Sequence, residues 1–322
     1  MLHTLGATVT GYALNPITQA DNFEVCGLHR FITDVRGDIR DYANMQQVFN
    51  QCKPEIVFHL AAQPLVLTSY DDPRGTYEVN VMGTVNVLEC IKSCPSVKAT
   101  VVITTDKCYE NKEQLWGYRE TDQLGGYDPY SASKACVELL VSSYRRSFQQ
   151  IIATARAGNV IGGGDWAENR IIPDCIRAYE KGGEINIRNP HAARPWQHVI
   201  EPLYGYMTLA ALLYNKGNNF ADAWNFGPDT TQTASVWALS TMLLRALGGG
   251  NLVDASSDNA PHETNFLSLD ITKARRQLGW QPVFSTEEAV TLTADWYSAY
   301  MKREALLPLC EKQIAYYFSK IK

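Results

Sequence analysis

The chain of 322 residues carries a net charge of −5, with 45% hydrophobic and 20% charged residues, which is ordinary for a globular protein with a real core. No cluster of lysines and arginines indicates a nucleic-acid partner, and no apolar segment approaches the roughly 20 residues of a membrane-spanning helix. The eight cysteines form no Cys-x-x-Cys pair, and the start of the sequence does not resemble an export signal. We therefore predict free thiols, no zinc site and a cytoplasmic protein.

Short apolar segments rich in β-branched residues alternate with longer helical patterns, which predicts an α/β fold with a mainly parallel sheet. The strands are expected at 7–13, 31–35, 55–61, 97–105 and 151–157. The helices between them are expected at 41–51, at 73–94 and from 129 onward. Pro73 and Pro129 stand in first helical turns, where the missing N–H of proline costs nothing.

The pattern loosens after about residue 165 into shorter helices and longer loops. We expect residues 1–160 to form the sheet domain and residues 161–322 to form mainly a second, smaller domain. A strand at 224–228 is expected to return to the sheet, within a stretch that spans 196–228. Further helices are expected near 234–247, 271–278 and 286–303.

Tyr130 and Lys134 stand four residues apart in a predicted helix, so a phenol and an ammonium share one helical face. A neighbouring cation stabilises a phenolate, which makes Tyr130 a candidate base for removing a proton from a sugar hydroxyl. The spacing alone is weak evidence. Tyr316 and Lys320 repeat it near the C-terminus, on a helix that we expect to be solvated.

Polar side chains follow the predicted strand at 97–105, namely Thr105, Asp106 and Lys107. In doubly wound sheets ligands bind outside the carboxyl ends of the strands, so these side chains are candidates for a ligand site, although a strand-end polar turn would look the same. Asn80 lies in an apolar helical stretch and needs a partner if it is buried. Asp38 is a candidate contact for an adenine amino group or, equally, a helix N-cap.

Several longer segments resemble the extended short-chain dehydrogenases that act on nucleotide sugars, and within them the CDP-glucose 4,6-dehydratase branch. The resemblance covers nearly the whole chain. It rests on AAQPLV (61–66), TTDKCYEN (104–111), DPYSASKACVELL (128–140), RAGNVIGGGDW (156–166), RIIPD (170–174), RPWQHVIEPL (194–203) and LDITKARRQLGWQP (269–282).

This resemblance implies a Rossmann-like doubly wound parallel sheet with a smaller C-terminal substrate-binding domain, a bound NAD and a homodimer. It implies that the catalytic residues are Thr105, Asp106, Lys107, Tyr130 and Lys134. The implied NAD contacts are Asp38, Ala61, Asn80, Tyr130 and Lys134. The implied contacts to the nucleotide diphosphate of the substrate are Asn159, Arg170, Arg194 and His198, and an arginine fork suits such an anion, although a structural salt bridge is an alternative for Arg170.

The implied reaction oxidises C4 of the sugar, removes water across C5–C6 with Asp106 as the acid, and reduces C6 to give a 4-keto-6-deoxy sugar. Many relatives carry a glutamate after the aspartate, and this chain has Lys107, as the CDP-glucose branch does. An ammonium cannot abstract a proton. The hypothesis that Lys107 moves the C5 proton therefore requires it to be held neutral by desolvation and neighbouring cations.

A second departure concerns the NAD site. Relatives begin with a strand and a Gly-x-x-Gly-x-x-Gly turn whose N–H groups hold the pyrophosphate, and these 322 residues contain neither. Loss of that central strand would leave its neighbours with unpaired backbone groups. An incomplete sequence is our preferred interpretation, and a genuinely short chain that binds NAD poorly is the alternative.

Two other functions stay open at this point. One is a nucleotide-sugar 4-epimerase, which shares the tyrosine–lysine pair but needs no acid for a C6 hydroxyl. The other is an inactive, truncated relative that keeps the sugar-nucleotide site. The sequence does not decide the nucleotide base of the substrate, or between NAD and NADP.

Overall fold

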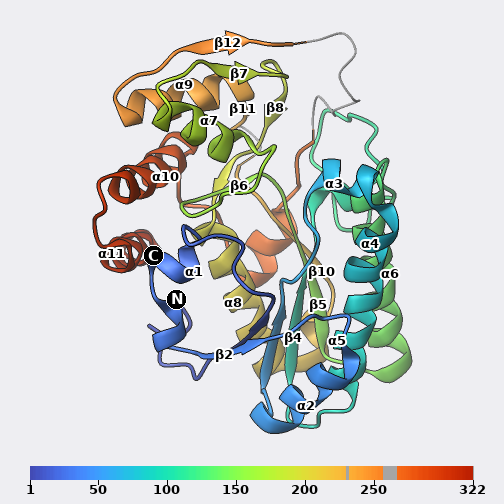
Figure 1. Ribbon diagram of the computed structural model, residues 1–322. Coiled ribbons are helices and arrows are strands. Elements are labelled where there is room, and N and C mark those ends of the chain that lie inside the picture. Colours follow the sequence, from blue (N-terminus) through green and yellow to red (C-terminus); the bar gives the residue numbers. More distant parts are fainter. Residues whose placement is uncertain (230–231, 257–266, 322) are drawn as a thin grey trace.

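Strands and helices alternate along the first 160 residues, and the computed structural model shows a parallel sheet covered by helices (Figure 1). The structure describes residues 1–229, 232–256 and 267–321. The strands are β1 (Thr10–Ala13), β2 (Thr33–Arg36), β3 (Ile56–His59), β4 (Ala99–Ile103), β5 (Ile152–Ala157), β6 (Val160–Ile161), β7 (Ile185–Ile187), β8 (Ala193–Arg194), β9 (Gln197–His198), β10 (Ala223–Phe226), β11 (Ala234–Ser235) and β12 (Leu252–Asp254).

The helices differ widely in length, from single turns to the long helix that carries Tyr130. The α-helices are α1 (Asn22–Val25), α2 (Tyr42–Cys52), α3 (Val66–Asp71), α4 (Pro73–Tyr77), α5 (Gly83–Lys92), α6 (Pro129–Phe148), α7 (Ile171–Glu180), α8 (Ile200–Lys216), α9 (Val236–Leu247), α10 (Thr286–Met301) and α11 (Leu306–Lys320). Short 3₁₀- and π-helical turns are η1 (Leu28–Arg30), η2 (Glu78–Met82), η3 (Asp106–Cys108), η4 (Gly217–Phe220) and η5 (Ala274–Leu278).

The main sheet is parallel, with the strand order β10-β5-β4-β3. Helices cover both of its faces. Since successive residues of a strand point to opposite sides, neighbouring residues of one strand contact different helices. Val101 of β4 packs into a core that contains the apolar side of α8, whereas Val102 packs into a core that contains residues of α5 and α6. The expected doubly wound arrangement is confirmed.

Strands β1 and β2 form a separate parallel pair, in register from Thr10 opposite Thr33 to Ala13 opposite Arg36. Tyr12 and Ile39 still pack into the core shared with α5 and α6. Among the described residues no strand bonds β1 to β3, and the neighbours remain in two sheets.

The second half of the chain builds its own core and also returns to the main sheet. Helices α7, α9 and α10 pack together through Ile176, Leu243 and Trp296, beside the two-stranded sheet of β7 and β12. Strand β10 pairs in parallel with β5, at the position where the sequence predicts a returning strand. The cavity described below lies between these two parts.

Two helices differ from the sequence-based expectation. The helix expected at 73–94 is divided into α4, the π-turn η2 and α5, and the helix expected at 271–278 contains the π-turn η5. The periodicity of apolar residues does not distinguish such a turn from a regular α-helix. Helix α11 follows α10 after a short break, and it carries the Tyr316 and Lys320 pair.

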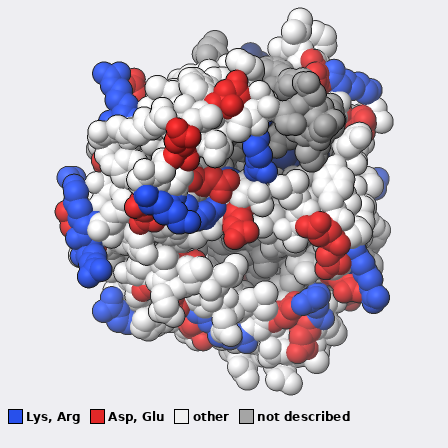
Figure 2. Space-filling view, turned by 45° about the horizontal axis from the view of Figure 1, so that its top comes forward, with Lys and Arg blue, Asp and Glu red and all other residues white. Residues whose placement is uncertain are grey.

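None of the helices among residues 1–229, 232–256 and 267–321 is long and apolar enough to cross a bilayer. On the face in Figure 2, basic and acidic side chains are interspersed around a hollow in the surface.

Candidate active site

A cavity of about 980 Å³ opens at the carboxyl ends of β4 and β5, where a doubly wound sheet binds its ligands. It brings together seven of the predicted site residues. Those that line it are Thr105, Asp106, Lys107, Tyr130, Asn159, Arg170 and Arg194.

The end of β4 turns sharply, which places three polar side chains at the cavity. Thr105 is the N-cap of η3, and its hydroxyl accepts a hydrogen bond from the N–H of Lys107 at 3.3 Å. The same hydroxyl donates to Oδ1 of Asp106 at 3.0 Å. Asp106 is 1% exposed, and its Oδ2 has no hydrogen-bond partner among the described residues. A buried carboxylate oxygen without a partner is costly, so this atom marks a functional position.

Tyr130 stands in the first turn of α6, and local sequence signals fix where this helix begins. Pro129 occupies the first helical position, and the side chain of Asp128 accepts a hydrogen bond from the N–H of Ser131 at 2.9 Å. Burial raises the pKa of Tyr130 to about 12, while a hydrogen bond with Thr105 and the charge of Arg170 act in the opposite direction. The phenol therefore needs further positive charge nearby to become an effective base.

Lys134 lies one helical turn behind Tyr130 and does not line the cavity. Lys134 is 6% exposed, and its ammonium donates a hydrogen bond to the backbone oxygen of Ile103 at 3.1 Å. Burial lowers the pKa of Lys134 to about 8, and the carboxylate of Glu138 opposes that shift. A buried amine is thus fixed at the end of β4, one helical turn from the residue that carries the phenol.

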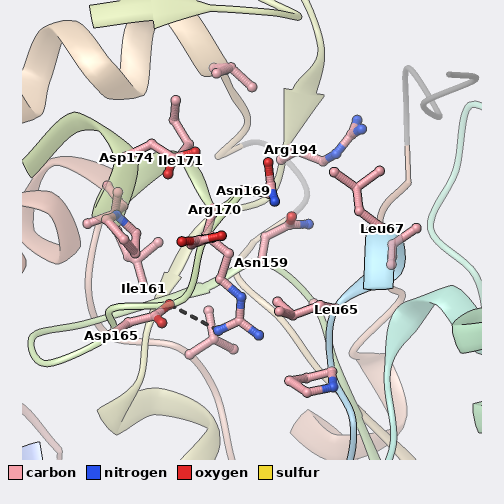
Figure 3. A pocket seen from close by; sticks show the side chains of 18 of the residues that line it. Leu65, Leu67, Asn159, Ile161, Asp165, Asn169, Arg170, Ile171, Asp174 and Arg194 are labelled. Atoms are coloured by element: carbon pink, nitrogen blue, oxygen red, sulfur yellow. Dashed lines mark hydrogen bonds and ion pairs between the residues drawn. The ribbon is translucent and has the colours of Figure 1, made fainter. Parts of the chain in front are cut away.

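The residues predicted to contact the diphosphate, apart from His198, also line the cavity (Figure 3). Arg170 precedes α7, and its guanidinium donates to the carboxylate of Asp165 at 3.0 Å. The Arg170 side chain is still 41% exposed, so it keeps donors for a ligand. Arg194 lies on β8 and Asn159 follows β5 with a left-handed φ of 47°.

Four predicted residues lie away from this cavity. Ala61 follows β3, and Asp38 follows β2 with its carboxylate bound by the Arg40 guanidinium at 2.6 Å. Asn80 is 1% exposed, and its side-chain amide is engaged by the backbone of Gln63 and by Ser133. It therefore ties the loop after β3 to α6 in this structure.

His198, the fourth, lies on β9 and lines a different, apolar groove of about 500 Å³. Its ring stacks edge-on against Phe284 at 6.0 Å between centroids, and burial lowers its pKa to about 4. Ile161, the residue of β6 that pairs with His198, does line the cavity, whereas His198 itself does not. The structure does not bring His198 together with Arg170 and Arg194.

The described residues fit one end of a dinucleotide better than the other. The buried ammonium of Lys134 and the phenol of Tyr130 suit a nicotinamide riboside at the carboxyl end of β4, and Asp38 stands at the end of β2. No glycine-rich turn precedes a helix beside β3 among the described residues, so these residues supply no pyrophosphate cradle of the usual kind.

Sequence reasoning missed several residues that shape the site. Glu138 and Arg156 form a buried ion pair below Lys134, with N–O distance 2.8 Å. Gly158 lies directly against the Asp106 carboxylate, and Asp165 holds Arg170. The signal available in the sequence was that Glu138 and Arg156, both charged, occupy positions where the helix and strand patterns predict burial.

Known proteins resemble this chain in sequence. The model of the GDP-mannose 4,6 dehydratase family matches residues 14–293. A CDP-glucose 4,6-dehydratase of Salmonella typhimurium is 44% identical over 99% of this chain and 91% of its own length. A CDP-paratose 2-epimerase of Salmonella typhi is 27% identical over 82% of this chain and 84% of its own length.

Solved structures establish the same fold. A UDP-glucose 4-epimerase of Thermotoga maritima, determined with UDP-glucose, aligns with a TM-score of 0.80 at 24% identity, over 93% of this chain and 94% of that one. A dTDP-glucose 4,6-dehydratase of Streptomyces venezuelae with bound NAD aligns with a TM-score of 0.74 at 24% identity, over 87% and 83%. On the extent of the family match and the identity to its curated relative, the chain belongs to the GDP-mannose 4,6 dehydratase family.

Proposed function

We propose that this protein is a nucleotide-sugar 4,6-dehydratase, a hydro-lyase that converts CDP-glucose to CDP-4-keto-6-deoxyglucose for deoxysugar synthesis. The nucleotide is carried over from the relative that is 44% identical. The observation that carries the reaction type is the pairing of a buried tyrosine with a buried aspartate, Tyr130 and Asp106, on one cavity. Dehydration needs a base at the C4 hydroxyl and an acid at the C6 hydroxyl.

The chain supplies each proton transfer from its own side chains. Tyr130 removes the proton of the 4-hydroxyl, and Lys134 stabilises the phenolate from below. When bound, NAD supplies the acceptor for the hydride of C4 and later returns it to C6. Once C4 is a ketone, the C5 proton is acidic, and Lys107 is the group on the cavity wall that we assign to its removal and to the return of a proton to C5 when C6 is reduced.

Asp106 then donates a proton to the departing C6 oxygen. The hydroxyl of Thr105 fixes one carboxylate oxygen, which leaves the other for the substrate. Arg170, Arg194 and Asn159 hold the diphosphate on the opposite wall, where their donors match the oxygens of a pyrophosphate.

Two measurements on the purified 322-residue chain test this proposal. Denaturation followed by assay of the released nucleotide reports whether NAD is held, and incubation with CDP-glucose followed by alkali reports a 4-keto product by its absorbance. We expect both signals. Conversion of the sugar to its C4 epimer without a 4-keto product would favour an epimerase. Binding of CDP-glucose without NAD or product would favour a truncated binding protein.

We also propose a homodimer and a cytoplasmic location, the latter on the scattered cysteines of the sequence. The dimer would form through α4, η2 and α6, which pack against one another and expose large apolar side chains. These are Tyr77, Met82, Leu139 and Phe148, with Leu139 61% exposed. Light scattering should report a dimer for the natural chain and a monomer for Leu139→Glu. A monomeric natural chain would contradict the proposal.

A further inference from the structure

A buried cluster of polar side chains adjoins the cavity through Thr104, which lines it. Its centre is Glu138, which is 4% exposed and stands one helical turn after Lys134 on the same face of α6. None of the reaction steps described above uses this carboxylate. A charged group is rarely buried without a partner or a task.

The carboxylate of Glu138 receives three donors from two strands. Its Oε1 accepts from the hydroxyl of Thr104 at the end of β4. Its Oε2 accepts from the hydroxyl of Thr154 at 2.7 Å and from the guanidinium of Arg156 at 2.8 Å, both on β5. These three hydrogen bonds, one of them from a buried cation, satisfy both oxygens of the buried carboxylate.

Arg156 is itself fixed on several sides, so the pair cannot move as a surface pair does. The guanidinium is 3% exposed, donates to the hydroxyl of Tyr109 at 2.7 Å and lies 4.8 Å from the centre of that ring. Tyr109 in turn donates to Asn225 of β10 at 2.8 Å. The negative charge of Glu138 therefore has one position, defined by α6, β4, β5 and β10.

The same strand end holds Lys134. The ammonium donates to the backbone oxygen of Ile103, and Thr104, the next residue, donates to Glu138. Lys134 and Glu138 are thus fixed to adjacent residues of β4, and burial removes the water that would otherwise screen them. The other titratable groups near the ammonium are His59 and the thiol of Cys108, and Tyr130 stands one helical turn before Lys134 on α6.

Resting on the function proposed above, we propose that Glu138 is a positioning residue for the reaction: its carboxylate keeps the buried Lys134 ammonium charged beneath Tyr130. The reaction needs that charge, because a neutral amine does not stabilise a phenolate. Among the groups that act on Lys134, Glu138 is the largest that favours its protonated form and so opposes the effect of burial.

The test is the pH profile of turnover in Glu138→Gln, which keeps the shape of the side chain and removes its charge. We expect the alkaline limb, where Lys134 loses its proton, to move to lower pH by about one unit, with product still formed below it. Thr154→Val is the matched control, because it removes one hydrogen bond to Glu138 and leaves the charge. Its alkaline limb should stay at the position of the natural chain.

The substitution Glu138→Gln leaves Arg156 as an unpaired buried charge, and that charge would be the cause if this variant unfolded. The double variant Glu138→Gln, Arg156→Met removes the pair together, and its alkaline limb should also move to lower pH. Titration of the Lys134 Nζ by lysine-selective NMR compares the same variants without turnover. If the natural chain makes no product, the proposed function is refuted, whereas the NMR titration still tests the role of Glu138. The role of Glu138 would be overturned if the alkaline limb and the Nζ titration stayed in place in both variants that remove its charge. It would also be overturned if Thr154→Val moved the alkaline limb by the same amount as Glu138→Gln.

Discussion

A Cβ atom built on Gly158 would stand 1.8 Å from Oδ2 of Asp106, so the residue that follows β5 and the carboxylate at the end of β4 share one space. Real Cβ contacts do not occur at that distance, and any side chain at 158 must displace the carboxylate. The position of Asp106 therefore depends on a glycine that is distant in sequence.

Gly158→Ala is predicted to lower the rate of dehydration by about 10- to 100-fold, because a small displacement of a catalytic group costs that much. Oxidation at C4 does not use the Asp106 carboxylate, so reduced nicotinamide should accumulate. Its absorbance at a longer wavelength than that of the oxidised form reports this. Gly183→Ala is the control, since its nearest neighbour is an ordinary 3.8 Å away. Equal dehydration rates in the two variants would contradict a steric role for Gly158.

Lys107→Met is predicted to stop exchange of the C5 hydrogen with solvent. Lys107 lines the cavity beside Asp106, and methionine keeps most of its length while removing the amine. Turnover in deuterium oxide followed by mass spectrometry of the sugar reports exchange at C5. Incorporation at the natural rate would remove Lys107 from the proton path.

Arg170→Met is predicted to raise the KM for CDP-glucose by about 10- to 100-fold, the usual effect of losing a charged hydrogen bond. Since the charge of Arg170 lowers the pKa of Tyr130, its removal should also move the acid limb of the pH profile to higher pH. Arg146→Met, on the exposed side of α6, is the control. An unchanged KM would leave Arg170 only its structural bond to Asp165.

His59 should make the protein sensitive to acid. Burial, assisted by the charge of Lys134, lowers the pKa of His59 to about 3, whereas the unfolded chain binds that proton near pH 6.5. Between pH 6.5 and 3 the unfolded state holds more protons, so stability falls as the pH falls.

Urea unfolding at pH 7 and pH 5 measures the size of this effect. Between pH 7 and pH 5 the free energy of unfolding of the natural chain should fall by about 2 kcal/mol more than that of His59→Gln. Glutamine is chosen because it can keep a hydrogen bond to Thr84. His191→Gln, at an exposed position, should behave as the natural chain does. Identical losses in all three proteins would contradict the assignment.

The sequence predicts the sheet well, because buried parallel strands are continuous apolar segments and the order of strands and helices is periodic. It also predicts the residues at the end of β4 and in the first turn of α6, since the carboxyl ends of parallel strands meet at one edge. The side-chain direction of His198 depends on how β9 pairs with β6, which no local pattern reveals. The pairing of Glu138 with Arg156 joins a helix to a strand and is equally invisible to periodicity.

The division of the sheet has a consequence for local stability. β1 and β2 hold each other through a single ladder, whereas β4 is bonded on both edges, by β3 and by β5. A two-stranded ribbon is marginal in water, and its attachment here rests on packing of side chains such as Tyr12. The backbone amides of residues 10–13 and 33–36 should therefore exchange with deuterium by local opening, long before those of β4, which wait for global unfolding.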